Sequence, residues 1–414
     1  KGVRIMRLKD IAYINPAYTG PDLGDQLVSF SPMECLRYDS LKPITISFSE
    51  AKGKYTFFKD NDILFAKVTP CFENQNIAIA NNLVNGIGFG SSEINVLRLK
   101  SDASLRYMFY VICSNRFYNT GCSSMCGVGG LKRINPRAVS TFEFTMPSLT
   151  EQEAIAAYLD KECEKIGRKI ELLERKAYAY SRLRRSLINR AVTRGLDPNV
   201  SLKPSPIAYE TEIPSHWEIR RIKSLFEERI EYSYTGNEDL LSVSEYYGIA
   251  KRADIIDNEN ISRSDSLEGY KRCYIGDIVS NIMLAWKGSL GMTNYNGIVS
   301  PAYGVYKPIY KLNSRYYHYL FRTELYKAIF KNHSRGIIDS RLRLYTPNFL
   351  ALKTFYPPLS EQNEIAAYLD EKCAKIDTIL EKINTEVERL KELKRSLINE
   401  VVTGQRAIDT ESRS

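Results

Sequence analysis

Three cysteines lie close enough together in the sequence to suggest metal chemistry. Cys122 and Cys126 are four positions apart, and Cys113 lies nine positions upstream. A structural zinc site needs four cysteine or histidine ligands, usually in two closely spaced pairs. No CxxC pair occurs, and the histidines are all distant from this cluster: His216, His318 and His333. The sequence therefore favours ordinary part-buried thiols, and we predict no metal site.

Other catalytic patterns are incomplete or missing. The sequence has no GxxxxGK[ST] phosphate-binding loop, which argues against ATP hydrolysis. The stretch NPAY (15–18) is similar to the NPPY-type loop of adenine methyltransferases, but it lacks one proline and a glycine-rich strand–helix turn beside it. Three histidines leave little room for a Ser/His/Asp site. The residues favour a non-catalytic binding protein, with a stand-alone methyltransferase of unrecognised motifs as an alternative.

The charge balance weakly favours a polyanionic partner. The 58 lysines and arginines exceed the 49 acidic residues, and the formal net charge is +9. Between Arg175 and Arg194 seven basic residues occur and no acidic ones, a run that suits either a polyanion or a solvated helix face. Eight scattered cysteines in 414 residues favour reduced thiols and a cytoplasmic location. No apolar run approaches the roughly 20 residues of a membrane helix, so we expect no membrane partner.

An internal repeat decides the expected architecture. The stretch EQEAIAAYLD begins at Glu151, and EQNEIAAYLD begins at Glu361. The likeness continues through residues 151–195 and 361–405, with 20 identities in 45 aligned positions. An identity of this size indicates a duplication of the chain.

Each repeat copy carries a heptad pattern. The pattern predicts two long helices, 148–195 and 358–405, that pack as a coiled coil. We expect Thr150 and Ser360 to be the N-caps, with Glu153 completing a capping box in the first copy. The helices should pair with each other, antiparallel, or else each with another subunit. The apolar seam positions are Leu159, Ile166, Leu173, Leu187, Leu369, Ile376, Ile383, Leu390 and Leu397.

The segments before the two helices, 1–147 and 217–357, are rich in aromatic, β-branched and turn residues, which suits strands and loops. A polar, proline-rich linker (196–216) joins the two copies, and a tail (406–414) ends the chain. We therefore predict an α+β protein. It has two mixed α/β domains, separated by two long antiparallel coiled-coil helices, in an internal pseudo-twofold repeat.

The repeat also resembles a known family. PPLSEQNEIAAYLDEKCAKID (357–377) and LKRSLINEVVTG (393–404) are similar to the helical region of the specificity subunit of type I restriction–modification systems. EIPSHWEIRRIKSLF (212–226) looks like that family's entry into its second target-recognition domain. NDILFAKV (61–68) and GDIVSNIM (276–283) resemble its recognition-domain strands. The resemblance covers the whole chain in the family's order.

The resemblance implies that each domain reads one half of a bipartite sequence in double-stranded DNA. It also implies that the helix pair sets the spacing and docks two methyltransferase (modification) subunits, which methylate adenine. Restriction subunits would join them for ATP-dependent cleavage. This chain would bind no cofactor, because S-adenosylmethionine, ATP and Mg²⁺ are expected on the partner subunits. A coiled-coil scaffold without DNA specificity is the other alternative.

Two loops carry the DNA-binding candidates. GVGGLKRIN (127–135) and RGIIDSRLRLY (335–345) both place glycine before basic residues. Glycine lets a backbone approach phosphate, and arginine can hold a guanine edge with two hydrogen bonds. Any one of these cations could instead be a solvated surface residue. The candidates are Lys132, Arg133, Arg335, Arg341 and Arg343. Lys67 and Lys287 are second-rank candidates, and each follows one of the two predicted strands that share the letters "DI".

Overall fold

The computed structural model describes residues 4–100, 103–128, 130–255 and 266–408. Two compact units make up the chain. Unit 1 comprises Lys1–Glu174 and Asn384–Ser414, and unit 2 comprises Arg175–Ile383. Each unit therefore contains one strand-rich domain, part of one long helix and part of the other.

The domain of unit 1 is built on two four-stranded sheets. The first sheet is antiparallel and has the order β2-β11-β8-β9. Its strands are β2 (Ala12–Ile14), β11 (Ile94–Leu99), β8 (Ile63–Ala66) and β9 (Ile77–Ile79). The second sheet has the order β6-β3-β10-β7, in which β3 and β10 are parallel. Its strands are β6 (Ile44–Ser47), β3 (Leu27–Ser31), β10 (Ile87–Gly90) and β7 (Thr56–Lys59).

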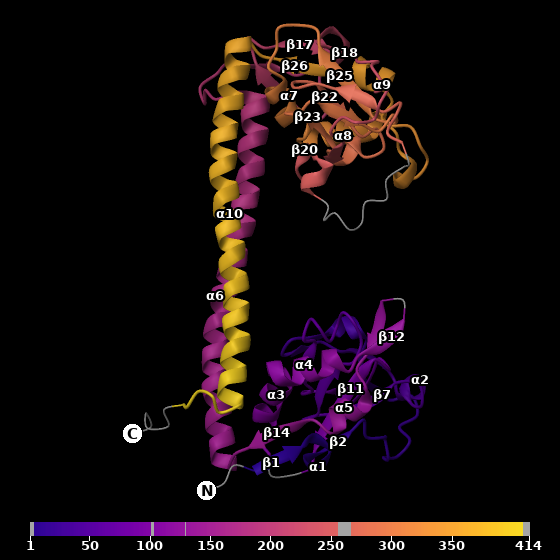
Figure 1. Cartoon of the computed structure of the whole chain (residues 1–414), viewed down its shortest axis with the longest axis vertical. Helices are drawn as coiled ribbons and strands as arrows, with labels where there is room; N and C mark the ends of the chain where they lie inside the picture. Colours follow the sequence, from indigo (N-terminus) through magenta and orange to yellow (C-terminus); the bar gives the residue numbers. More distant parts are fainter. Residues whose placement is uncertain (1–3, 101–102, 129, 256–265, 409–414) are drawn as a thin grey trace. The chain divides into compact units, whose positions relative to one another are not determined.

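Smaller elements complete unit 1 (Figure 1). The short strands are β1 (Arg4–Arg7), which pairs with β14 (Glu143–Met146), and β4 (Leu36–Arg37), which pairs with β5 (Ser40–Leu41). The helices are α1 (Leu8–Ile11), α2 (Phe48–Ala51), α3 (Leu105–Cys113), α4 (Asn115–Ser123) and α5 (Pro136–Ser140). Buried aromatic side chains of α3, such as Tyr107 and Phe109, belong to the main core of this unit.

Unit 2 repeats the first of these sheets. Its four-stranded antiparallel sheet has the order β18-β25-β22-β23, which matches β2-β11-β8-β9 strand for strand. The strands are β18 (Phe226–Glu228), β25 (Gly304–Pro308), β22 (Ile278–Ser280) and β23 (Leu290–Met292). Two-stranded pairs surround it: β17 (Glu218–Arg221) with β26 (Lys353–Tyr356), β19 (Leu241–Ser244) with β20 (Gly248–Lys251), and β21 (Lys271–Cys273) with β24 (Gly297–Val299). The helices are α7 (Ser314–Phe321), α8 (Glu324–His333) and α9 (Thr346–Ala351).

The two long helices are α6 (Leu149–Arg194) and α10 (Leu359–Val402) (Figure 1). In unit 1 the first turns of α6 share a core with the last turns of α10, and Lys169 pairs with Glu386 at 3.0 Å. In unit 2 the end of α6 shares a core with the start of α10, and Arg184 pairs with Asp377 at 2.9 Å. Within each unit the helices therefore run antiparallel, and the predicted fold class is confirmed.

The heptad positions lie between the helices. The α10 residues are all buried: Leu369, Ile376, Ile383, Leu390 and Leu397. On α6 Leu159 is buried, whereas the other seam residues are half-buried: Ile166, Leu173 and Leu187. None of the described helices is long and apolar enough to cross a membrane.

The predicted helix caps are wrong by two residues. Helix α6 begins at Leu149, so Ser148 precedes it and Thr150 lies inside its first turn. The Ser148 hydroxyl accepts from the backbone N–H of Glu151, and the Glu151 carboxylate accepts from the N–H and hydroxyl of Ser148. The capping box is therefore formed by Ser148 and Glu151 instead of Thr150 and Glu153. Ser360 likewise lies inside α10, which begins at Leu359.

The segment predicted as a linker has structure of its own. Strands β15 (Leu202–Pro204) and β16 (Glu212–Pro214) form a hairpin within 196–216. Ile207 and Ile213 from this segment are buried in the core of unit 2. Apolar anchors therefore fix this connection to unit 2. Of the predicted tail, residues 409–414 lie outside the described part of the chain.

Candidate nucleic-acid interface

The candidate loop of unit 1 contains a two-stranded hairpin, which we call the first hairpin loop (126–128 and 130–133). Its strands are β12 (Cys126–Val128) and β13 (Leu131–Arg133). The hairpin is attached beyond the end of β8, where the backbone N–H of Ile134 donates to the carbonyl of Lys67 at 2.9 Å. The N–H of Thr69 donates to the carbonyl of Lys132 at 3.0 Å, and the Thr69 hydroxyl accepts from the N–H of Lys132 at 2.9 Å. The structure therefore brings Lys67, Lys132 and Arg133 together.

Arg133 already has a protein partner. Its Nε and Nη2 atoms donate to the two carboxylate oxygens of Glu93, at 2.9 and 2.7 Å. These hydrogen bonds lower the pKa of Glu93, and the charge of Lys67 lowers it further. The Nη1 atom of Arg133 makes no hydrogen bond to another described residue, so this end of the guanidinium can meet a ligand while the pair with Glu93 stays intact.

The second candidate loop has the same design, and we call it the second hairpin loop (335–343). Arg335 and Arg343 exchange two backbone hydrogen bonds of 2.9 Å as an antiparallel bridge, and the 3-10 turn η7 (Asp339–Arg341) lies between them. The N–H of Leu344 donates to the carbonyl of Ile282, just beyond β22, at 2.8 Å. Since β22 corresponds to β8, both hairpin loops are attached at the same place on the repeated sheet.

One glycine in each loop has a structural role that differs from the predicted one. Gly127 has φ +153° and Gly336 has φ +149°. A Cβ atom at Gly127 would lie 2.3 Å from the carbonyl oxygen of Leu131, and one at Gly336 would lie 2.5 Å from that of Arg341. Both glycines are therefore required by the close approach of the facing backbone within the loop. Contact with phosphate is not needed to explain them.

The basic residues of the second hairpin loop differ in their freedom. Arg343 donates through Nη1 to the carbonyls of Ser340 and Leu342, at 3.2 and 2.8 Å. Arg335 and Arg341 are exposed, and within the described residues their guanidinium groups have no hydrogen-bond or ion-pair partner. These two side chains are available to a ligand without breaking a contact.

Lys287 is linked to the second hairpin loop through an aromatic side chain. Its ammonium group is 5.2 Å from the ring centre of Trp286, and Lys331 of α8 is 4.8 Å from the same ring. Lys331 also pairs with Asp339 of the second hairpin loop at 2.9 Å. Trp286 and Lys331 thus connect Lys287 to the loop that carries the candidate arginines.

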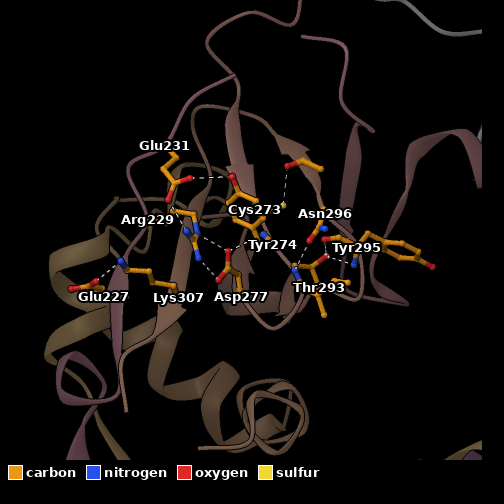
Figure 2. A network of polar contacts seen from close by, with 12 residues as sticks. Glu227, Arg229, Glu231, Cys273, Tyr274, Asp277, Thr293, Tyr295, Asn296 and Lys307 are labelled. Atoms are coloured by element: carbon orange, nitrogen blue, oxygen red, sulfur yellow. Dashed lines mark hydrogen bonds and ion pairs between the residues drawn. The ribbon is translucent and has the colours of Figure 1, made fainter. Parts of the chain in front are cut away.

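The aspartates of the shared "DI" stretches form buried ion pairs that could not be predicted from the sequence. Asp62 and Asp277 are buried, and each accepts two hydrogen bonds from one arginine, Arg98 and Arg229 respectively. Figure 2 shows Arg229 lying between Asp277 and Glu231, beside the ion pair of Lys307 and Glu227. A buried carboxylate needs such a partner, because burying an unpaired charge costs several kcal/mol. These ion pairs fix β8 and β22, from which the hairpin loops are attached.

Two further polar contacts recur where each domain meets its long helix. Buried Gln152 accepts from the N–H of Ser104 and donates to the carbonyl of Pro147, both at 2.9 Å. Gln362 makes the equivalent bonds to Asn313 and Pro357, at 2.9 and 2.8 Å.

Asp160 and Asp370 complete these junctions. Asp160 accepts from Arg106 and Tyr110, and Asp370 accepts from Arg315 and Tyr319, all within 2.8 Å. The sequence signal is the pair RYMFY (106–110) and RYYHY (315–319), a repeat that sequence reasoning missed. The repeated EQ and YLD residues of the helices therefore hold the domains.

Arg322 organises the loops beside Lys287. Its guanidinium donates to five backbone carbonyls, which belong to Ser244, Glu245, Tyr246, Gly288 and Leu290. Burial lowers the pKa of Arg322 to about 10. The turn that exposes Tyr246 and the loop that carries Lys287 are thus tied to one side chain.

A family model described as "Type I restriction modification DNA specificity domain" matches residues 3–175 and 214–389. The chain is 36% identical over 165 residues to the EcoEI specificity subunit of a type I restriction enzyme from Escherichia coli, and 38% identical over 152 residues to the EcoAI subunit from the same species. These matches cover 39% and 36% of this chain but only 28% and 26% of the two relatives. A third relative, the MjaVIII specificity subunit of Methanocaldococcus jannaschii, is 23% identical over 324 residues, 72% of this chain and 69% of its own.

Solved structures share the fold. A chain solved in work on complex assembly and conformational transition of the type I R-M system has a TM-score of 0.73, with 16% identity and 98% of each chain covered. The HsdS subunit from Thermoanaerobacter tengcongensis has a TM-score of 0.52, with 17% identity, and covers 98% of this chain and 97% of its own. Since the family model matches most of the chain in two copies that follow its repeat, the chain belongs to the type I restriction–modification DNA specificity family.

Proposed function

We propose that the chain is the DNA-binding specificity subunit of a type I restriction–modification complex. Each strand-rich domain reads one half of a bipartite target in double-stranded DNA. One observation carries this proposal. An exposed, basic hairpin loop recurs at the same place on two domains that differ in sequence. Phosphate contacts by such cations would position the protein, and contacts to base edges would select the sequence.

Free and engaged cations suit these two tasks differently. In unit 2, Arg335 and Arg341 can reach a guanine edge or a phosphate directly. In unit 1, Lys132 is exposed, whereas Arg133 is held by Glu93 in a fixed plane. A fixed guanidinium favours base reading, because a preorganised fork loses less freedom on forming two hydrogen bonds.

The long helices would separate the two half-sites and dock two modification subunits. Those subunits would bind S-adenosylmethionine and methylate adenine. Restriction subunits, with ATP and Mg²⁺, would add cleavage. This chain would be non-catalytic and act in the cytoplasm, a location that suits its eight free cysteines.

A domain exchange tests the proposal. Residues 217–357 are replaced by the corresponding domain of a relative, and the chain is expressed with its modification partner. Sequencing the methylated sites of the host should then show that only one half of the target has changed. A change in both halves, or in neither, would contradict modular reading.

The purified chain also tests the alternatives. Incubated alone with DNA and tritiated S-adenosylmethionine, it should transfer no label, whereas a methyltransferase would. A footprint at one defined bipartite sequence distinguishes the proposed subunit from a scaffold without DNA specificity.

A further inference from the structure

The tip of the second hairpin loop exposes apolar side chains. Ile337 is 100% exposed and Ile338 is 54% exposed. The loop does not lack apolar anchors, because Leu342 and Leu344 are only 8% and 1% exposed. Anchoring the loop therefore does not account for the isoleucines at its tip. Removing such a side chain from water is favourable, so a partner that covers these isoleucines would bind more tightly.

The corresponding loop of unit 1 has the same plan. Leu131, at the turn of the first hairpin loop, is 49% exposed, whereas Ile134 at its base is 4% exposed. Lys132 and Arg133 follow the exposed residue, as Arg341 and Arg343 follow the isoleucines. An apolar tip with basic neighbours thus occurs at the equivalent place in both domains.

This combination matches one feature of duplex DNA. The neighbouring cations Arg335 and Arg341 complement phosphate charge, and two antiparallel chain segments fit a major groove ~12 Å wide. In that groove the only apolar group that a base pair presents is the C5-methyl group of thymine. An isoleucine is also stiff at χ1, so fixing it against a methyl group costs little side-chain entropy.

We infer that Ile337 contacts the C5-methyl group of a thymine in the half-site read by unit 2. The inference rests on the proposed function, and it adds an apolar reading residue to the basic ones. Ile338 supports the same contact from its half-exposed position.

Thymine-to-uracil replacement tests the contact, because it removes only the methyl group. The second half-site is first identified from the methylated sequences of the host. The full chain with its modification subunits is then titrated with duplexes in which each thymine of that half-site is replaced in turn by uracil. At one position the wild-type complex should bind about fourfold more weakly, because a buried methylene-sized group is worth ~0.8 kcal/mol and tenfold is ~1.4 kcal/mol.

A double-mutant cycle identifies the side chain. With Ile337→Ala, the uracil duplex and the thymine duplex should bind equally well at that position. Ile309→Ala is the matched control. Ile309 is 47% exposed and follows β25, whose end lies beside the start of β22, whereas the second hairpin loop is attached beyond the end of β22. This control should retain the full effect of uracil.

Three outcomes would overturn the inference. The half-site could contain no thymine, or uracil could weaken wild type and Ile337→Ala equally at every position. A rise in 2-aminopurine fluorescence that depends on Ile337 would indicate a wedge between base pairs instead of a groove contact. In each case binding to the bipartite sequence would persist, so the proposed function would stand. Loss of that binding in the wild-type complex would instead contradict the proposed function.

Discussion

Arg341 and Arg343 lie two positions apart on the second hairpin loop, yet only Arg343 forms hydrogen bonds within the loop through its side chain. The Arg343 guanidinium bonds to backbone carbonyls of its own loop, whereas that of Arg341 has no partner among the described residues. We expect Arg341→Ala to weaken binding at the second half-site alone. A lost base contact would cost ~1–3 kcal/mol and relax specificity there. Arg343→Ala should affect the same half-site through the shape of the loop.

Titrations at several salt concentrations measure this effect. A phosphate contact by Arg341 would instead lower affinity for every sequence and reduce the salt slope by about one. Arg221→Ala is the matched control, because Arg221 is an exposed arginine of β17 in the same unit. An equal loss from Arg221→Ala would show that the second hairpin loop has no special part in binding.

His318 is expected to make the stability of unit 2 depend on pH. Burial and the charge of Arg322 hold the pKa of His318 well below its usual 6.5, and Nδ1 accepts from the N–H of Met292 at 3.2 Å. Below pH 6.5 the unfolded chain therefore binds a proton that the folded chain does not. The stability contributed by neutral His318 is complete above pH 6.5 and falls by up to ~1.4 kcal/mol per pH unit below it.

Denaturant unfolding between pH 5 and 8 checks this expectation. His318→Gln keeps an acceptor but cannot gain a proton, so its curve should be flatter than that of wild type below pH 6.5. Above pH 7 the difference between the two proteins should be constant. Parallel curves over the whole range would show that His318 does not control the dependence.

At the scale of elements, the junction of a domain with its long helix depends on one buried amide. Gln362 is 0% exposed and holds the N–H of Asn313, which precedes α7. Gln362→Ala would leave this donor without its partner, at a cost of ~1–3 kcal/mol in the free energy of unfolding of unit 2. Hydrogen exchange should show faster exchange at Asn313.

The neighbouring Glu364 supplies the control for this test. It is exposed in the same helical turn, so Glu364→Ala should change stability by less than ~0.5 kcal/mol. Similar losses from both variants would mean that the helix is weakened generally. In that case the loss would not come from the hydrogen bond at Asn313.

The range of an interaction decides how much of these elements the sequence predicts. Heptads predict the long helices because their apolar residues repeat at short, regular spacing. Cap choice is harder, since Ser148 and Thr150 are both good caps and the outcome depends on Glu151 reaching back. The hairpin loops are found from their glycines and cations, but the clash that requires those glycines appears only in three dimensions.

Long-range ion pairs are largely hidden from the sequence. Asp62 pairs with Arg98, 36 positions later, whereas Asp277 pairs with Arg229, 48 positions earlier. The two copies thus neutralise the same buried carboxylate with arginines from different places, Arg98 within β11 and Arg229 directly after β18, so the two pairs share no common spacing in the sequence. The junction contacts are easier to predict from the sequence, because their spacing is nearly the same in both copies. Gln152 lies 48 positions from Ser104, and Gln362 lies 49 from Asn313. Aligning the two domains would reveal that near-equal spacing.

At the scale of the whole molecule, duplication separates what is constant from what varies. The repeated sheet, its buried aspartate and the junction with the helix recur in both copies. The hairpin loops keep their place but differ in sequence, as reading two different half-sites would require. The remaining shared part is the pair of long helices, α6 with 46 residues and α10 with 44.

If these helices set the distance between half-sites, their length should set the number of unread base pairs. A 46-residue helix spans roughly 70 Å, which corresponds to at most ~20 base pairs at ~3.4 Å each. Inserting one heptad after Leu173 and one after Ile383 lengthens both helices by ~10 Å and preserves the seam register. These sites lie at the limits of the two units, so each unit keeps its own contacts.

We expect the variant to methylate the same two half-site sequences with the gap widened by up to about three base pairs. Sequencing of methylated host DNA gives the gap directly. Affinity should fall, because three base pairs turn the second half-site by roughly 100° about the DNA axis, whereas one heptad turns the helix by only ~20°. A four-residue insertion at the same sites is the control, since it breaks the seam register and should abolish the ordered spacing. Folded, DNA-binding protein with both heptads and the original gap would show that these helices do not measure the distance.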